Sequence, residues 1–236
     1  RSGQVNCWMP DNEIGINIAT ATIKGDRPVN QDALIARRMD PDRNVWNLHA
    51  LVGVADGMGG HSAGEVASKI AADTVEDLLG LSTGDDGQLA ARVADMELKE
   101  ALTTTVQLAN ERIHKRGAQN SSQQDMGTTS TIVCVGSENA HIAHLGDTRG
   151  YLMDEEGIHQ VTQDHSWAAE QVRENHMSEE EATRSPLRSQ LTRALGAPDA
   201  VKPDVHTIPL QAGSIYLVCS DGVTGVVEPQ EISEII

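Results

Sequence analysis

The residues LVGVADG at positions 51–57 form a short apolar run that stops at an Asp-Gly pair. A second run, IYLVCSDG at positions 215–222, ends in the same way. Short runs that are rich in β-branched residues and closed by a turn signal are typical of buried strands. If both strands belong to one core, Asp56 and Asp221 meet at one edge, where their charges repel unless a cation lies between them. The two runs predict a divalent metal site, although each Asp-Gly pair alone is also an ordinary turn.

The composition limits the kinds of partner. The chain has 236 residues, a formal net charge of −17, no Phe, three Trp and two Tyr. This length fits one domain, or two small ones. Nucleic acids and anionic membranes are bound by clusters of Lys and Arg, and base stacking requires aromatic side chains. We therefore predict neither a nucleic-acid partner nor a membrane partner.

The cysteines and the hydropathy bear on the compartment. Cys7, Cys134 and Cys219 are widely spaced and form no Cys-x-x-Cys pair. The latter two fall in predicted strands, where a free Cys behaves as a small hydrophobe. No apolar stretch approaches the roughly 20 residues that span a bilayer, and the first residues show no secretory pattern. We expect a cytoplasmic protein.

Apolar spacing predicts the order of strands and helices. Strands are expected at 14–22, 46–55, 128–135, 140–145, 149–153, 158–161, 205–208 and 214–220. Helices are expected at 62–79, 88–115 and 167–185 and from Pro229, with capping boxes at Ser62/Glu65 and Ser178/Glu181. The short strands between 128 and 161 predict a β-meander. Groups of strands with a helical hairpin between them indicate an α+β layered fold.

Three further patterns fail specific tests. The glycine-rich loop at 57–64 lacks the Gly-x-Gly-x-x-Gly spacing and a Gly-Lys-Ser/Thr sequence, which argues against a nucleotide site. Asp164-His165-Ser166 holds the residue types of a hydrolase triad, but adjacent residues cannot converge in that geometry, so we interpret it as a turn. His141 and His144 are three apart on a predicted strand, face opposite sides and cannot share a metal.

Arg27 and Asp32 could add to the predicted site, Arg27 by binding phosphate and Asp32 by joining the carboxylates at the metal edge. An Arg fork suits bidentate phosphate binding, and Asp32 follows Arg27 closely in the chain. Asp147 lies between Gly146 and Thr148 at a strand end. Taken alone, each of the three is also an ordinary surface or turn residue.

Seven motifs taken together resemble the bacterial metal-dependent protein phosphatases of type 2C, the PPM family. The resemblance covers the chain from about Ile14 to its C-terminus. In order, the motifs are Arg27-x-x-Asn30-Gln31-Asp32, Ala55-Asp56-Gly57-Met58-Gly59-Gly60-His61, Gly127-Thr128-Thr129, Leu145-Gly146-Asp147-Thr148-Arg149, Thr162-x-Asp164-His165-Ser166, Leu191-Thr192-Arg193-Ala194-Leu195-Gly196 and Cys219-Ser220-Asp221-Gly222.

The resemblance implies an antiparallel β-sandwich flanked by helix pairs, in α-β-β-α layers. It implies that residues 1–236 form a single phosphatase catalytic domain, with a helical flap at 167–190. It also implies that Asp56 bridges two Mn²⁺ or Mg²⁺ ions and that Gly57 binds through its carbonyl. Asp221 would bind one ion of the pair, and Asp32 would hold the cluster directly or through metal-bound water. Asp147 matches a third, weaker metal site. Arg27 and Asp56 are the catalytic residues implied, with Arg27 binding the phosphate.

The implied function is that of a protein serine/threonine phosphatase, which hydrolyses phosphoserine and phosphothreonine with a metal-activated water. Its partners would be phosphorylated proteins and a serine/threonine kinase. Two alternatives stay open on the sequence: a non-catalytic PPM-like phosphoprotein-binding or regulatory module, and a phosphatase of small metabolites.

Two positions depart from the family pattern. Animal relatives carry a histidine closely after the Asp-Gly pair, where this chain has Met58. The family also has a further Asp-Asn before its last strand, and no acid after Asp221 matches it. We expect that the domain continues beyond Ile236; the alternative is a variant without this aspartate.

Overall fold

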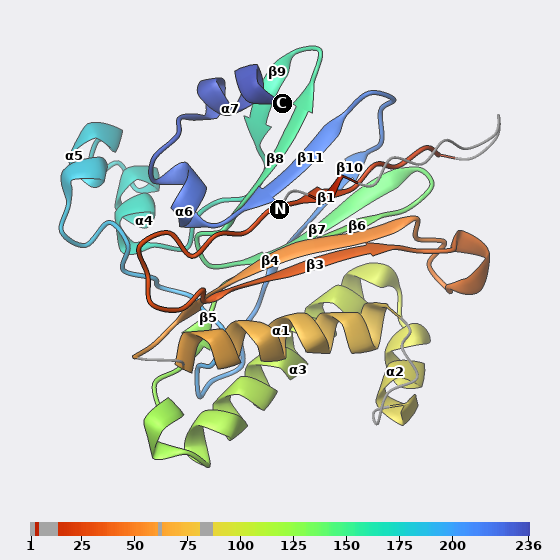
Figure 1. The fold of residues 1–236 in the computed structure, drawn as a ribbon, viewed down its shortest axis with the longest axis horizontal. Helices are drawn as coiled ribbons and strands as arrows, with labels where there is room; N and C mark the ends of the chain where they lie inside the picture. Colours follow the sequence, from red (N-terminus) through yellow and green to blue (C-terminus); the bar gives the residue numbers. More distant parts are fainter. Residues whose placement is uncertain (1–2, 5–13, 61–62, 81–86) are drawn as a thin grey trace.

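Two antiparallel sheets packed face to face form the centre of the molecule (Figure 1). The computed structural model describes residues 3–4, 14–60, 63–80 and 87–236. The larger sheet has the strand order β10-β7-β6-β4-β3, with β5 paired to β4. Its strands are β3 (Asp32–Arg38), β4 (Ala50–Met58), β5 (Gly127–Thr128), β6 (Ser130–Val135), β7 (Asn139–Leu145) and β10 (Asp204–Pro209). The smaller sheet has the order β11-β8-β9 and consists of β8 (Arg149–Asp154), β9 (Gly157–Gln160) and β11 (Ile215–Cys219).

Helices cover the outer face of the larger sheet. There α1 (Ala63–Leu79) and α3 (Leu98–Ala118) pack together, with α2 (Gly87–Ala94) near one end (Figure 1). On the opposite side of the molecule, α6 (Asp221–Thr224) and α7 (Pro229–Ile235) contact the smaller sheet. Two further helices, α4 (Trp167–Arg173) and α5 (Glu179–Arg184), lie at one end of the sandwich (Figure 1). The predicted α+β sandwich is confirmed, although its second helical layer is thin.

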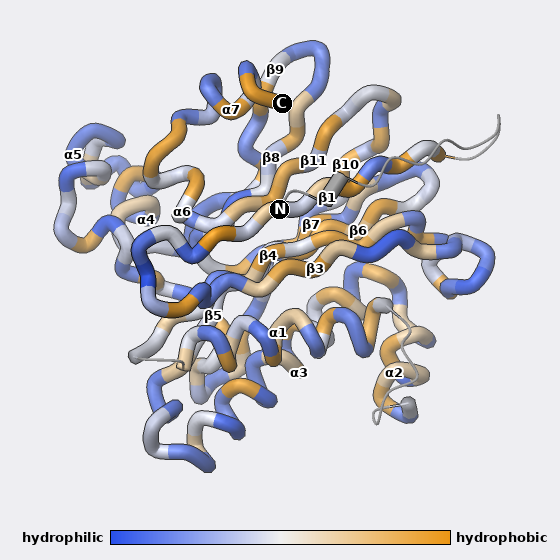
Figure 2. The backbone as a smooth tube through the Cα atoms, viewed as in Figure 1, coloured by the Kyte–Doolittle hydropathy of each residue, from blue (hydrophilic) through white to orange (hydrophobic). Residues whose placement is uncertain are grey.

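Strand β4 lies inside the larger sheet and is buried on both faces. Neighbouring residues on a strand point to opposite faces. Leu51 and Ile132 accordingly pack against the helices, whereas Ala50 and Val133 pack against the smaller sheet. Figure 2 shows hydrophobic colour concentrated along these central strands and hydrophilic colour on the outer loops. Burial on both faces explains why the run at 51–55 is continuously apolar rather than alternating.

The chain changes sheets between β7 and β8. Strand β7 pairs with β6 and β10 in the larger sheet, while β8 pairs with β9 and β11 in the smaller one. The turn contains Gly146 with φ of 114°, and a Cβ there would lie 2.5 Å from the Thr129 side chain. The predicted continuous β-meander is therefore wrong, because glycine allows a tight turn that redirects the chain into the second sheet.

The long helix predicted at 88–115 is two helices, α2 and α3. The break falls at residues 95–97, where Trp46 Nε1 donates a hydrogen bond of 2.9 Å to Met96 O. This bond satisfies a carbonyl that lies outside both helices. The apolar spacing continues through the break, so the sequence pattern did not reveal it.

Three other predicted boundaries differ from the structure. Of residues 14–22, only Ala19–Thr20 form a strand (β2), which pairs with β1 (Gly3–Gln4). Strand β4 starts at Ala50 rather than 46, because Asn47 adopts φ of 53° in a preceding turn. The helix predicted at 167–185 is divided into α4 and α5 at Asn175, which has φ of 58°.

The structure also bears on the two predicted capping boxes and on membrane-spanning helices. The capping box at Ser178/Glu181 is confirmed at the start of α5. Ser62, which belongs to the other predicted box, lies outside the described residues. Across the described ranges, no helix combines the length and the apolar character needed to cross a membrane.

Candidate active site

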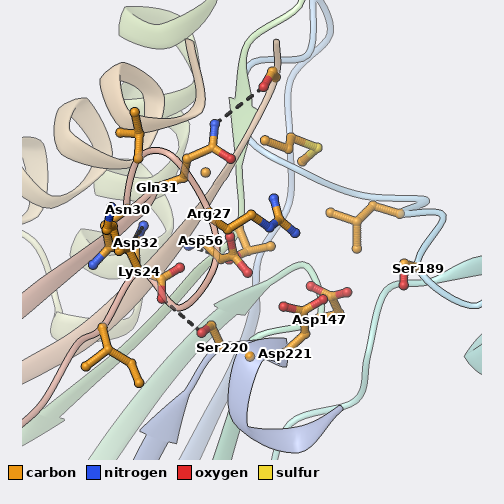
Figure 3. Close-up of a pocket in the computed structure, with 18 residues that line it drawn as sticks. Lys24, Arg27, Asn30, Gln31, Asp32, Asp56, Asp147, Ser189, Ser220 and Asp221 are labelled. Carbon is orange, nitrogen blue, oxygen red and sulfur yellow. Dashed lines mark hydrogen bonds between the residues drawn. The ribbon is translucent and has the colours of Figure 1, made fainter. Parts of the chain in front are cut away.

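Four carboxylates line one open pocket of about 450 Å³ (Figure 3). They are Asp32, Asp56, Asp147 and Asp221. Asp32 starts β3, Asp56 lies near the end of β4, and Asp221 follows β11, so the two sheets bring together residues that are far apart in sequence. The sequence-based expectation that Asp56 and Asp221 meet at one edge is confirmed by this shared pocket.

The strand register fixes the first two carboxylates. Asp32 and Asp56 are direct partners across β3 and β4, so their side chains project to the same face. The hydroxyl of Ser220, just before Asp221, donates a hydrogen bond of 3.1 Å to Asp32 Oδ2. This bond joins the ends of the two sheets. Asp147 lies in the turn where the chain passes from one sheet to the other.

The backbone of Asp56 is held from both sides by two buried threonines. Its N–H donates to Thr129 Oγ1 at 3.0 Å. Its carbonyl accepts from the Thr129 N–H and from Thr128 Oγ1, both at 2.9 Å. Both threonine side chains are buried, so water does not compete for these bonds. Asp56 is therefore a rigidly placed residue rather than a mobile loop aspartate.

Gly57 occupies a position that no other residue type fits. A Cβ there would lie 2.0 Å from the carbonyl oxygen of Gly64 and 2.8 Å from that of Gln31. The Gly57 N–H donates to Gln31 O at 3.0 Å, and the residue lines the pocket. The Asp-Gly pair is thus required by close packing of three backbone segments, and it leaves a backbone carbonyl beside the carboxylates.

The carboxylates oppose one another's ionisation. Burial, followed by the charges of Asp32, Asp221 and Asp147, raises the pKa of Asp56 to about 8. Burial, followed by the charges of Asp221 and Asp164, raises the pKa of Asp147 to about 6. A carboxylate whose pKa is raised in this way is stabilised in its ionised form when a cation binds beside it.

The donor set fits a hard divalent cation. The pocket is lined by four aspartates and by Gly57, and carboxylate and backbone carbonyl oxygens are the ligands that Mg²⁺ and Mn²⁺ prefer. Within the described part of the chain, no three Asp, Glu, His or Cys side chains are close enough together to enclose an ion by themselves. Water and backbone oxygens would have to complete the coordination shell, which is usual for Mg²⁺.

Two cationic side chains belong to the same pocket. Lys24 and Arg27 lie on an exposed turn in which the Arg27 N–H donates to Lys24 O at 3.1 Å. In Figure 3 the Arg27 side chain extends into the pocket above Asp56, Asp147 and Asp221. The pocket therefore places a guanidinium next to a group of carboxylates, an arrangement that would bind a phosphate between Arg27 and bound cations.

All the predicted site residues lie in this pocket: Arg27, Asp32, Asp56, Gly57, Asp147 and Asp221. Sequence reasoning missed the residues that hold them, namely Ser220, Thr128 and Thr129. The Gly127-Thr128-Thr129 motif was the signal for the threonines, but their partner Asp56 is 72 and 73 positions away.

The histidine predictions are confirmed in part. His141 lies on the partly exposed face of β7, where its ring bonds to Thr207 on β10. His144 is fully buried on the other face, so the two histidines cannot bind one metal ion. Asp164, His165 and Ser166 form no triad: Asp164 pairs with Arg149, His165 with Asp204, and Ser166 caps α4. The almost complete burial of His165 was not foreseen.

Comparison with known proteins agrees with this site. Residues 23–236 match the family described as Protein phosphatase 2C. A relative from Listeria innocua, named "Serine/threonine phosphatase stp", is 36% identical over 186 residues, which cover 79% of this chain and 71% of the relative. The solved serine/threonine phosphatase of S. agalactiae superposes with a TM-score of 0.76 at 30% identity, covering 91% of this chain and 82% of that one.

A second solved structure is the catalytic domain of the phosphatase PstP in complex with two manganese ions. It has a TM-score of 0.70 at 30% identity and covers 88% of this chain and 78% of that one. The chain described here belongs to the protein phosphatase 2C family. It is a metal-dependent protein serine/threonine phosphatase, and its substrates are phosphorylated proteins. No comparison supports the non-catalytic alternative.

Proposed function

We propose that Asp56, Asp221 and the Gly57 carbonyl would hold two Mn²⁺ or Mg²⁺ ions, with Asp56 contributing to the binding of both. Asp32 would bind this pair directly or through water, and Asp147 together with Asp221 would hold a third, weaker ion. The main support is that Asp32, Asp56, Asp147 and Asp221 line one pocket, where burial and the neighbouring charges raise the pKa of Asp56 to about 8. When bound, the ions supply a water of lowered pKa as the nucleophile.

In this proposal Arg27 is the phosphate-binding residue. Its paired N–H groups bind the non-bridging oxygens of the phosphorylated side chain and offset the charge that grows in the transition state. The threonine bonds to the Asp56 backbone keep that carboxylate oriented during turnover. Met58 lines the pocket but has no proton to donate, so a water protonates the departing serine or threonine oxygen.

We further propose that residues 1–236 act as one catalytic domain and that 167–190 is its flap. Helices α4 and α5 lie at the pocket end of the sandwich (Figure 1), and Ser189, which follows them in the chain, lines the pocket wall (Figure 3). This segment would therefore contact the protein chain on either side of the phosphorylated residue and affect which phosphoproteins fit.

The proposed partners are phosphorylated proteins and the serine/threonine kinase that modifies them. The net charge of −17 supports the absence of nucleic-acid and membrane partners, because anionic surfaces repel an acidic protein. Two buried free thiols, Cys134 and Cys219, are compatible with the reducing conditions of the cytoplasm, where we place the protein.

Turnover of a phosphothreonine peptide with Mn²⁺ tests the site assignment. We expect Asp56→Asn to lower kcat at least about 100-fold, because a neutral amide cannot replace a bridging carboxylate. The exposed Asp42→Asn is the matched control and should leave turnover unchanged. Calorimetric titration with Mn²⁺ should show loss of binding in Asp56→Asn alone. Turnover that Asp56→Asn does not affect would reject the proposal, and faster turnover of sugar phosphates than of the peptide would reject the substrate class.

A further inference from the structure

His165 lies next to the proposed metal site and has no role in the mechanism above. Its ring is 2% exposed. Its Nδ1 accepts a hydrogen bond of 3.0 Å from the Gly146 N–H, and its own backbone N–H donates to Gly146 O at 2.7 Å. One residue thus satisfies both backbone groups of the glycine that immediately precedes Asp147.

The hydrogen-bond partners determine the tautomer of His165. A backbone N–H can only donate, so Nδ1 carries no hydrogen and the neutral ring has its hydrogen on Nε2. This atom lies 2.9 Å from Asp204 Oδ2, which accepts that hydrogen, and also 2.7 Å from Nη1 of Arg193. Arg193 fixes Asp204 in turn through a bond of 3.0 Å to the other carboxylate oxygen. The imidazole is therefore held in one orientation by Asp204 on β10.

A second histidine supports the other side of the same turn. His144 is fully buried and stacks on His165, with ring centroids 4.7 Å apart. Its Nε2 donates to Gln163 O at 3.0 Å, which leaves Nδ1 to accept from Thr131 Oγ1 at 2.8 Å. Thr131 Oγ1 in turn lies 2.7 Å from the hydroxyl of Thr148, the residue immediately after Asp147.

Both neighbours of Asp147 in the chain are thus held by buried side chains, while its own carboxylate faces the pocket. We propose that His165 is a positioning residue for the phosphatase reaction, because its Nδ1 fixes Gly146 and thereby the Asp147 carboxylate that binds a metal ion. The inference depends on the proposed role of Asp147. His165 itself touches neither substrate nor metal. Residues that hold a metal ligand in place without touching the metal typically change metal affinity about 10–100-fold when they are replaced.

Two amide variants separate positioning from simple packing. In His165→Asn the side-chain oxygen takes the place of Nδ1 and can still accept from Gly146. In His165→Gln the longer amide reaches the place of Nε2 and Asp204 but offers Gly146 no acceptor. The exposed His159→Gln is the matched control. Three quantities are measured for each: Mn²⁺ affinity by calorimetry without substrate, hydrogen exchange of the Gly146 amide, and the Mn²⁺ concentration that gives half-maximal turnover.

We expect His165→Gln to speed exchange at Gly146 and to raise the Mn²⁺ requirement about tenfold. The exchange rate at Gly146 and the Mn²⁺ requirement of His165→Asn should stay close to those of the unmodified protein, even if its denaturation midpoint falls. Equal Mn²⁺ requirements in the two variants, or losses that follow only the denaturation midpoint, would overturn the inference. Should His165→Ala also be made and fail to fold, the comparison of the two amides still decides the question.

Asp147→Ala distinguishes failure of this inference from failure of the proposed function. If Asp147→Ala raises the Mn²⁺ requirement and His165→Gln does not, the positioning role of His165 is wrong and the metal assignment stands. If Asp147→Ala leaves the Mn²⁺ requirement unchanged, Asp147 is not a ligand, and the inference about His165 is overturned with it.

Discussion

Asp56 combines a fixed backbone with an unfavourable electrostatic environment. Two threonines hold its N–H and its carbonyl, while burial and then the charges of three carboxylates in the same pocket raise its pKa to about 8. The fold therefore imposes a position that the metal-free side chain disfavours. Binding sites commonly reduce stability in this way, because function requires like charges that only a ligand neutralises.

Arg27 provides a test of the phosphate role at the scale of one side chain. We expect Arg27→Ala to raise KM for a phosphothreonine peptide about 10–100-fold, which corresponds to the roughly 1.5–3 kcal/mol of hydrogen bonds to a charged group. Affinity for Mn²⁺, measured by calorimetry, should change little because Arg27 binds no metal.

Two control variants sharpen this measurement. Arg27→Lys keeps the charge but loses the planar fork, so its KM should fall between those of the other two proteins. Arg43→Ala removes an arginine from another exposed turn and should leave KM unchanged. A parallel loss of Mn²⁺ affinity in Arg27→Ala would show that Arg27 acts on the metals rather than on the phosphate.

The site residues differed in how well the sequence revealed them. Asp56 and Asp221 were visible because each ends an apolar run, and Arg27, Asp32 and Asp147 became visible through the family motifs. Ser220, Thr129 and His165 stand in the same motifs, but their roles were not foreseen, because these depend on contacts with residues 188, 73 and 19 positions away, respectively. A sequence pattern records spacing along the chain and does not show which distant segments touch.

At the scale of elements, helix α3 supports the pocket from behind. Asn110 on α3 is 3% exposed and accepts from the Gly196 N–H at 2.7 Å. Its amide nitrogen donates to Ala197 O and Asp199 O, both at 3.1 Å. Leu195 in the same loop pairs with Thr128, whose hydroxyl bonds the Asp56 carbonyl. The helix is thus connected to the candidate active site through one loop and one short strand.

Asn110→Ala should lower the free energy of unfolding by about 2–3 kcal/mol, because it leaves one buried donor and two carbonyls without partners. Asn110→Asp keeps the acceptor for Gly196 but directs a carboxylate at two carbonyls, so we expect it to be at least as destabilising. Gln107→Ala on the same helix removes one bond of 3.4 Å and should lower the free energy by less than about 1 kcal/mol. Urea denaturation measures all three, and equal effects of Asn110→Ala and Gln107→Ala would contradict this account.

The strands were predicted more accurately than the long helices. Runs such as 140–145 and 215–219 are closed by turns, and their positions agree with β7 and β11. The break between α2 and α3 was missed because a tertiary contact overrides apolar spacing that continues through it. The split between α4 and α5 at the left-handed Asn175 was missed although the predicted capping box at Ser178/Glu181 marks the start of α5. The exchange of sheets at Gly146 was missed because strand periodicity does not specify pairing.

For the whole molecule, buried ionisable groups set how stability depends on pH. The pKa of Asp56 is raised from 3.8 to about 8, so the metal-free folded state binds more protons than the unfolded state between these values. The stability that Asp56 contributes is fully present below pH 3.8, the pKa of the unfolded state, and is lost as the pH rises toward 8. Burial lowers the pKa of His144 from 6.5 to about 3. This shift makes stability increase with pH, but only below about pH 6.5.

Among the described residues with a shifted pKa, Asp56 is therefore the only one whose shift changes stability between pH 6.5 and 8. In the presence of a chelator we expect the free energy of unfolding to fall by about 2 kcal/mol over this range, measured by urea denaturation. The fall should vanish in Asp56→Asn. With saturating Mn²⁺ it should vanish or reverse, because metal binding favours the ionised carboxylate. A flat curve for the unmodified protein in chelator would show that Asp56 ionises without penalty.

The direct pairing of Asp32 with Asp56 across β3 and β4 links chemistry to sheet alignment. Because side chains alternate along a strand, a slip of one residue would turn Asp32 away from its partner and move every apolar residue of β3 to the wrong side. A misaligned copy of this protein would thus be both poorly packed and unable to gather its cations. Divalent-ion uptake therefore reports how many molecules in a refolded sample have correctly aligned strands, even before any substrate is added.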